Sequence, residues 1–367
     1  MKIPFVDLRA QYLAIKPGID TAIQSVIDDT AFIRGKYVEK FEAEFARKYG
    51  VKHCISVANG TDALYITLKA LGIGHGDEIL TVANSWISTS EIITQAGARV
   101  VFADIEPDYY TIDASKIEDK ITKKTKAIIP VHLYGQSAEI DTIKDICDDH
   151  DLYLIEDCAQ AHFATCNGQK VGTFGIAGTF SFYPGKNLGA YGDAGAIITD
   201  DDILAEKMRM FANHGALQKH HHEIEGINSR MDGIQAAVLS VKLPYIDEWN
   251  EKRYQNALKY NQLLNDIKEI KIPPIRNNTS HVFHVYVIQT KNREGLQKHL
   301  QDQGISTAVH YPIALPFLKA YSYLGHSPQD FPVAYSNQGK ILSLPMYPEL
   351  SNDAIHWITG KIREFYI

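Results

Sequence analysis

The chain has 367 residues, 45% of them hydrophobic, and a formal net charge of −7 at pH 7. This length supports a large core and two domains, and the interspersed charges exclude the basic surface of a protein that binds nucleic acid or an anionic membrane. No run of about 18 apolar residues predicts a membrane-spanning helix, and the first residues lack the apolar core of a signal peptide. We therefore expect a cytoplasmic protein.

The cysteines and histidines predict neither disulfides nor a functional metal site. The 4 cysteines show no CxxC spacing, which favours reduced thiols. Among the 15 histidines, three are adjacent at residues 220–222, and no HExxH pattern occurs. Adjacent histidines on a regular element cannot all face one ion, so we expect no metal.

Short β-rich runs alternate with helical patterns between residues 50 and 200. The expected helices include 62–71 and 140–149, and the expected strands are 53–57, 78–82, 100–103, 127–132, 152–156, 177–183 and 195–199. Such alternation predicts βαβ units and a mostly parallel sheet. The short glycine-rich connection before the last strand leaves no room for a crossover helix, so one strand there should be antiparallel. The prediction is an α/β fold with a seven-stranded mixed sheet.

A second, smaller α/β domain is expected after Arg230. A helical pattern covers residues 236–267, in which Pro244 should kink the helix or start a second one. A polar link (272–280), a strand (282–289), a helix (293–303) and a strand (307–311) follow. We place the large domain at residues 1–235 and the linking helix with the small domain at residues 236–367.

The most informative segment is SFYPGKNLGAYGDAG at residues 181–195. It places Lys186 in a glycine-rich turn between two strand-like runs, where Gly185, Gly189 and Gly192 allow a tight backbone. An amine held at the rim of a sheet can form a Schiff base with a carbonyl cofactor. The alternative at this point is a loop lysine that faces water.

Other candidate residues follow the predicted strands, at the sheet edge where α/β proteins bind ligands. Gly60 and Thr61 would offer N–H groups and a hydroxyl to a phosphate at a helix start, although any α/β protein has such starts. Asp157 follows a buried run and would pair with a protonated pyridine nitrogen, or else cap a following helix. Gln160, one helical turn further, would reach the phenolic oxygen of the cofactor.

Two further side chains fall at the same edge. Trp86 would stack on a planar ring, or else belong to the core. Ser181, five residues before Lys186, would give its hydroxyl to the phosphate. These candidates, each modest alone, gather at one edge of one sheet.

Together these residues resemble the DegT/DnrJ/EryC1/StrS family of sugar-nucleotide aminotransferases, which have the aspartate aminotransferase fold (fold type I) and use pyridoxal 5′-phosphate. The similarity covers essentially the whole chain. It rests on PFVDL (4–8), FIRG (32–35), ANGTDAL (58–64), VHLYG (131–135), IEDCAQ (155–160), the lysine segment, GINSRMD (226–232), HYP (310–312) and SLPM (343–346).

The resemblance implies a role for each matching residue. Lys186 would be the Schiff-base lysine and proton shuttle, with pyridoxamine 5′-phosphate as the intermediate form of the cofactor. Asp157 would bind the pyridine nitrogen. Asn228 would reach the cofactor phosphate of a neighbouring subunit, which implies a homodimer with shared active sites. Arg230 and the pair His310 and Tyr311 would line the sugar-nucleotide cleft.

The resemblance also implies the substrates, L-glutamate and a keto-sugar nucleotide. The lysine segment, Gln160 and HYP at 310–312 are similar to members that act on 3-keto sugars, and the product would serve surface glycans such as the O-antigen of lipopolysaccharide. Cys158, Phe163 and the loop 213–222 depart from the family pattern, and that loop leaves dTDP and UDP both open. The alternatives are a 4-keto-sugar (perosamine-type) aminotransferase and a non-catalytic regulator that binds the cofactor. An NAD-dependent dehydrogenase is excluded because ANGTD stands where GxGxxG would be needed.

Overall fold

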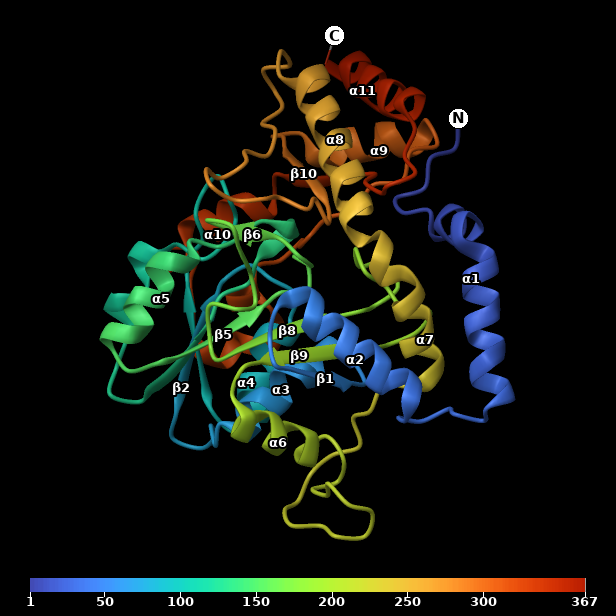
Figure 1. Ribbon diagram of the computed structural model, residues 1–367. Helices are drawn as coiled ribbons and strands as arrows, with labels where there is room; N and C mark the ends of the chain where they lie inside the picture. Colours follow the sequence, from blue (N-terminus) through green and yellow to red (C-terminus); the bar gives the residue numbers. More distant parts are fainter. Residues whose placement is uncertain (367) are drawn as a thin grey trace.

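A seven-stranded sheet lies at the centre of the computed structural model, which describes residues 1–366 (Figure 1). The strand order is β1-β9-β8-β5-β4-β2-β3. The strands are β1 (His53–Val57), β2 (Glu78–Val82), β3 (Arg99–Ala103), β4 (Thr125–Ile129), β5 (Tyr153–Asp157), β8 (Ala177–Ser181) and β9 (Gly195–Thr199). The predicted seven-stranded mixed sheet is confirmed. Strands β4 and β8 end before the predicted limits, and beyond β4 Val131 pairs with Asp157 only as an isolated bridge.

Strand β9 is the antiparallel strand that the short connection predicts. It pairs antiparallel with both β1 and β8, and all other neighbours in the sheet are parallel. Gly195 therefore lies opposite both Val57 and Ser181, at the place where β1 and β8 end. The carboxyl ends of the parallel strands and the start of β9 share one edge, the edge at which α/β sheets bind ligands.

Helices cover both faces of this sheet. On one face α2 (Lys36–Tyr49) packs its phenylalanines against β8 and the residues after it, and Phe45 meets Phe180 at a centroid distance of 5.3 Å. On the other face α3 (Gly60–Ala70) and α6 (Asp202–Phe211) bury Ile66 and Met208 with Ile197 of β9. Helices α4 (Ser88–Gln95) and α5 (Ile140–Asp149) pack with β2, β4 and β5.

The long helical pattern after Arg230 is interrupted where Pro244 predicts it. Helix α7 (Gly233–Lys242) leads through a 3-10 turn (Leu243–Tyr245) into α8 (Ile246–Leu264). Proline lacks the N–H that a continuous helix would use, so the turn tightens there. Helix α1 (Leu8–Asp28), which the sequence reading did not anticipate, packs against α7 (Figure 1).

Helices α9 (Arg293–Asp302) and α11 (Asn352–Tyr366) and the strand β10 (Tyr286–Gln289) gather at the far end of α8 (Figure 1). Strands β10 and β11 (Ile341–Leu344) pair antiparallel. The remaining elements are a short β6–β7 pair (Thr165–Cys166 and Gln169–Lys170) and α10 (Pro332–Gln338). The domain limit at residues 235 and 236 stays a prediction.

The predicted strand at residues 307–311 is wrong. Only Ala308 pairs with a strand, exchanging two backbone hydrogen bonds with Ser343 of β11. The chain then leaves the strand, because His310 and Tyr311 turn their side chains to the cavity wall. Within residues 1–366 no helix is long and apolar enough to cross a lipid bilayer.

Candidate active site

A cavity of about 580 Å³ lies at the sheet edge where β1, β5 and β8 end. All the predicted site residues except Asn228 and Arg230 line it, namely Gly60, Thr61, Trp86, Asp157, Gln160, Ser181, Lys186, His310 and Tyr311. These residues are scattered along the chain, and the parallel strands bring them to one edge. The cavity thus joins an amine, a carboxylate, several hydroxyls and an aromatic ring.

Lys186 lies in a tight turn after β8. Its backbone N–H donates to the Tyr183 carbonyl at 2.8 Å. Gly189 is required for the turn, because a Cβ there would lie 2.4 Å from the Pro184 carbonyl oxygen. The ammonium donates no hydrogen bond to any residue from 1 to 366, and burial lowers the pKa of Lys186 to about 8 although the charge of Asp157 opposes the shift. A larger share of this amine is therefore uncharged near neutral pH than in an unperturbed lysine.

Asp157 is the last residue of β5 and only 5% exposed. It accepts hydrogen bonds from the Thr89 hydroxyl at 2.8 Å and from the Ala159 N–H at 3.1 Å. Burial raises the pKa of Asp157, mainly by desolvation of the charged form. Residues 158–164 form turns and no helix, so the helix-cap alternative is wrong and Gln160 is not one helical turn away. A buried carboxylate in this position is suited to a cationic partner in the cavity.

Gln160 connects two tyrosines at the cavity wall. Its Oε1 accepts from the Tyr134 backbone N–H at 2.8 Å, and its Nε2 donates to the Tyr311 hydroxyl at 2.9 Å. The first bond fixes the orientation of the amide, because a backbone N–H cannot accept. One N–H of the amide and the hydroxyl proton of Tyr311 remain available to a ligand.

The start of α3 forms a cradle for an anion. Asn59 caps the helix by accepting from the Asp62 N–H at 2.8 Å, and the Thr61 hydroxyl lies 2.7 Å from the Ser88 hydroxyl. A Cβ on Gly60 would lie 2.6 Å from the Ser181 Cβ, so only glycine lets β8 approach the helix start so closely. The first N–H groups of a helix have no partner within it, and they favour phosphate.

Trp86 is a surface residue of the cavity and not part of the core. Its side chain is 59% exposed, and its ring centroid lies 5.8 Å from that of Tyr311. The interplanar angle of 48° leaves the indole tilted beside the tyrosine. The core alternative is excluded, and an open aromatic face stands at the mouth of the site.

Asn228 and Arg230 do not line the cavity of their own chain. Asn228 is exposed and bridges to Asn213 at the base of the loop that projects from the lower part of Figure 1. Between them Ser229 accepts a hydrogen bond from the Ala58 N–H at 3.1 Å. The segment therefore lies directly behind the turn that begins α3, on the outside of the site.

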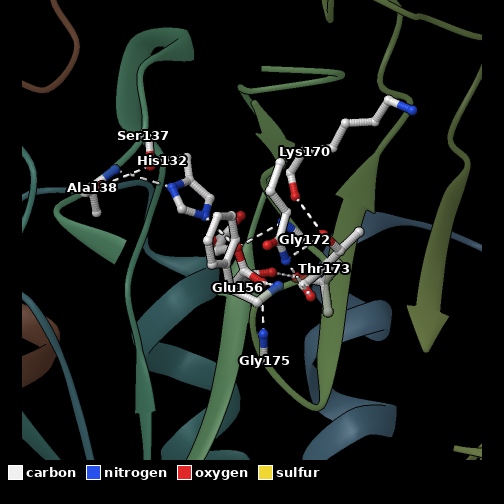
Figure 2. A network of polar contacts seen from close by, with 12 residues as sticks. His132, Ser137, Ala138, Glu156, Lys170, Gly172, Thr173 and Gly175 are labelled. Carbon is white, nitrogen blue, oxygen red and sulfur yellow. Dashed lines mark hydrogen bonds and ion pairs between the residues drawn. The ribbon is translucent and has the colours of Figure 1, made fainter. Parts of the chain in front are cut away.

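A buried polar network supports the end of β5 from the opposite face (Figure 2). Glu156 accepts hydrogen bonds from the N–H groups of Gly172, Phe174 and Gly175 at 2.6 to 3.0 Å and lies 3.0 Å from His132 Nε2. His132 Nδ1 accepts from the backbone N–H of a neighbouring loop, so Nε2 must be the donor.

Together with Cys158, these two residues place three potential metal-ligand atoms within 4.8 Å of one another. The network argues against a metal, since both Glu156 oxygens and both His132 nitrogens already have partners. Burial also raises the pKa of Cys158 well above its usual value, which keeps the thiol protonated. The network fixes the strand that carries Asp157.

Sequence reasoning missed two residues of this cavity. Thr89 lies on α4 and holds Asp157, and only the cluster of hydroxyl residues after β2 hinted at it. His284 lines the cavity from the segment before β10, where the local sequence pattern gave no signal. Both act through long-range contacts.

The model of the DegT/DnrJ/EryC1/StrS aminotransferase family matches residues 14–363. The chain belongs to this family. It is therefore a sugar-nucleotide aminotransferase that uses pyridoxal 5′-phosphate, with pyridoxamine 5′-phosphate as the aminated form.

Relatives cover the whole chain. A pleiotropic regulatory protein of Geobacillus stearothermophilus is 45% identical over 100% of this chain and 99% of its own length. A UDP-N-acetyl-3-dehydro-alpha-D-glucosamine 3-aminotransferase of Acidithiobacillus ferrooxidans is 41% identical over 98% and 97%. A dTDP-3-amino-3,6-dideoxy-alpha-D-galactopyranose transaminase of Aneurinibacillus thermoaerophilus is 41% identical over 99% of each chain. The crystal structure of S. venezuelae DesV with a ketimine intermediate matches at a TM-score of 0.97, with 38% identity and coverage of 100% and 98%.

The cavity fits the cofactor of the family. The Lys186 amine has no hydrogen-bond partner among residues 1–366, and the buried Asp157 carboxylate has room for a further donor. The helix start at Gly60, with the hydroxyls of Thr61 and Ser181, supplies a seat for a phosphate.

Proposed function

We propose that this protein transfers the amino group of L-glutamate to the 3-keto group of a sugar nucleotide, giving a 3-amino sugar nucleotide. The observation that carries transamination is the unpartnered Lys186 amine, in one cavity with the buried Asp157 carboxylate and the start of α3. The 3-keto assignment is supported by relatives, two of which act at sugar carbon 3 by name.

Lys186 and Asp157 would carry the chemistry. When bound, pyridoxal phosphate supplies a carbonyl that takes up an amine and a ring that accepts an electron pair. The Lys186 Nζ removes the proton from the α-carbon of glutamate and later delivers a proton to the sugar carbon, a general acid–base role for which a pKa of about 8 is suitable. The charge of Asp157 would keep a proton on the ring nitrogen, and hydrogen bonds from Thr89 and Ala159 hold Asp157 in place.

The remaining cavity residues would bind and orient. Gly60, Thr61 and Ser181 would hold the phosphate, Trp86 would stack on the ring, and one amide N–H of Gln160 would be available to the phenolic oxygen. His310 is fixed by the Ser343 hydroxyl at 2.8 Å from its Nδ1. It thus presents its other ring edge toward the sugar-nucleotide side.

Gln160 determines which hydrogen-bond donors the cavity wall offers. Its amide donates to Tyr311, so the tyrosine hydroxyl is free to donate its own proton into the cavity. A glutamate at this position would accept the Tyr311 proton instead. The cavity of this chain therefore offers a hydroxyl donor that a glutamate would remove.

The regiochemistry is tested by incubating the holoenzyme with L-glutamate and separate 3-keto and 4-keto sugar nucleotides, each dTDP-linked and UDP-linked. Product NMR should show nitrogen at carbon 3. Amination at carbon 4 alone would overturn the assignment in favour of a perosamine-type enzyme, while leaving transamination intact.

A regulatory role is the second candidate, because the Geobacillus relative bears the name of a regulatory protein. In a regulator the bound cofactor would act only as a signal. Lys186 would then not need to detach from the cofactor or to transfer protons. Multiple turnovers with any keto-sugar nucleotide would exclude the purely regulatory reading.

The proposal includes a homodimer in which Asn228 of one subunit reaches the phosphate site of the other. Its support is that Asn228 and Arg230 lie behind the α3 turn and outside their own cavity. A mixture of Asn228→Ala and Lys186→Ala chains, denatured and refolded together, should contain some intact sites and regain activity. If the activity of the refolded mixture equals the sum of the activities of the two variants alone, the active sites are not shared between subunits.

A further inference from the structure

His284 lies on the cavity wall near Lys186 and is not among the residues to which a role was assigned above. Its backbone is held on both sides, since its N–H donates to the Tyr134 carbonyl at 2.9 Å and its carbonyl accepts from Arg253 at 3.3 Å. The backbone of His284 therefore has a defined position. The question is which of the two imidazole nitrogens carries the hydrogen.

A chain of asparagines answers this question. Asn250 donates through Nδ2 to the His162 carbonyl at 3.0 Å, so its Oδ1 is an acceptor. Asn187 donates through Nδ2 to that Oδ1 and to the Val282 carbonyl, both at 2.9 Å. Because backbone carbonyls only accept, both amide orientations are fixed. The Asn187 Oδ1 must then accept from His284 Nδ1, which lies 3.2 Å away.

The imidazole of His284 also stays neutral. Burial lowers the pKa of His284 well below its ordinary value, and the positive charges of Lys186 and Arg253 act in the same direction. A neutral ring with its hydrogen on Nδ1 has a bare lone pair on Nε2. Among residues 1–366 that Nε2 has no hydrogen-bond partner, and His284 is one of the residues that line the cavity.

We propose that His284 is a specificity-determining residue whose Nε2 accepts a hydrogen bond from a hydroxyl group of the sugar ring. This inference rests on the proposed function. Of the two substrates, glutamate carries carboxylates, which only accept, and its one amine is the reacting group. A sugar ring carries hydroxyl donors. The Nε2 lone pair therefore favours the sugar and disfavours a carboxylate at the same place.

Two substitutions separate the two nitrogens. His284→Asn keeps a donor at the δ position for Asn187 and removes the acceptor at the ε position. His284→Gln removes the δ donor and places an amide oxygen near the ε position. Loss of one neutral hydrogen bond changes binding by about fivefold to tenfold. We expect His284→Asn to raise the KM of the keto-sugar nucleotide by that factor, and His284→Gln to recover part of the loss.

The two half-reactions give the control. Bleaching of the cofactor absorbance by L-glutamate should stay within about twofold of wild type in both variants, since no glutamate hydrogen is assigned to Nε2. The 15N NMR shifts of His284 in the holoenzyme should show Nδ1 protonated and Nε2 bare. Titration calorimetry should show the same weakening for the 3-amino sugar nucleotide product.

The proposal is overturned if His284→Asn slows both half-reactions equally, if it leaves the sugar KM unchanged, or if NMR finds the proton on Nε2. Failure of the proposed function looks different. In that case wild type itself aminates no 3-keto sugar nucleotide, whatever the tautomer of His284.

Discussion

Two lysines, Lys186 at the cavity wall and Lys242 on α7, both have lowered pKa values but opposite surroundings. Burial lowers the pKa of each to about 8. Lys242 is fully buried on α7, where its ammonium donates to the Gly189 carbonyl at 2.7 Å and lies 4.2 Å from the ring centroid of Tyr191. Lys186 lines the cavity, and its ammonium has no hydrogen-bond partner among residues 1–366.

The comparison shows that a shifted pKa does not by itself mark a reactive group. The ammonium of Lys242 is already occupied, and it ties α7 to the turn that carries Lys186, since Gly189 follows three residues later. The amine of Lys186 has access to a ligand and a carboxylate, Asp157, nearby. Lys242 stabilises the turn, and Lys186 is the residue of the turn that is free to react.

Replacing the reactive lysine should have the largest effect. Lys186→Met removes both the amine that binds the cofactor and the proton carrier, so turnover should fall by about 10⁴-fold or more. The free energy of unfolding of the apoprotein should not decrease, because the ammonium has no partner to lose. A coupled assay for 2-oxoglutarate and thermal unfolding measure the two. Full turnover would remove Lys186 from the mechanism.

Asp157→Asn should have the next largest effect. The amide keeps the shape and can still bond Thr89 and Ala159, but it loses the negative charge that holds a proton on the ring nitrogen. We expect a rate loss on the order of 10²-fold or more with the cofactor still bound. The matched control is the neighbouring Glu156→Gln, on the opposite face of β5, which should mainly cost about 1–3 kcal/mol of stability. A larger rate loss in the control would reverse these roles.

Lys242→Met sharpens the comparison directly. It leaves the Gly189 carbonyl without its donor in a buried place, which should lower the free energy of unfolding by about 1–3 kcal/mol. Activity should remain within a few-fold of wild type. Chemical denaturation and steady-state kinetics measure the two effects. If this variant is as inactive as Lys186→Met, the presence of a hydrogen-bond partner on the ammonium does not distinguish a structural lysine from a reactive one.

The smallest effect concerns pH. Both lysines have a folded pKa of about 8 against 10.5 for an unperturbed lysine. Between these values the unfolded chain binds more protons than the folded one, so each lysine makes the protein more stable as the pH rises from about 8 toward 10.5. In the apoprotein variants Lys186→Met and Lys242→Met, the free energy of unfolding should increase less over this pH range than in wild type. Tyrosines and cysteines oppose it equally in all three proteins, so the differences isolate the lysines. If the curves of unfolding free energy against pH are parallel for wild type and both variants, the lowered pKa values are contradicted.

Local patterns carried much of the fold and of the candidate site. Strands β1, β2 and β9 have the predicted limits, because their apolar runs end at clear turn residues. Lys186 and Asp157 were recognisable because Lys186 follows a buried strand, Asp157 ends one, and each lies in a motif of its own. Residues 307–311 have a strand-like composition, and only the contacts of Tyr311 with Gln160 show why the chain leaves the sheet there.

Other parts required the folded chain. In the sequence Lys242 resembles any lysine on a helix. The residues around it do not predict that Gly189 is its hydrogen-bond partner. Thr89 and His284 act on groups that lie far away in the sequence. The tautomer of His284 depends on two asparagines whose orientations are fixed by backbone carbonyls. These interactions depend on tertiary contacts, which the local periodicity of the sequence does not reveal.

The most direct test of the account is the absorbance spectrum of the purified protein with pyridoxal phosphate, before and after L-glutamate, with Lys186→Met in parallel. We predict a yellow band in wild type that glutamate bleaches and a 3-keto sugar nucleotide restores, and no such cycle in the variant. A yellow band that glutamate leaves unchanged, or a variant that cycles like wild type, would contradict the central role of Lys186.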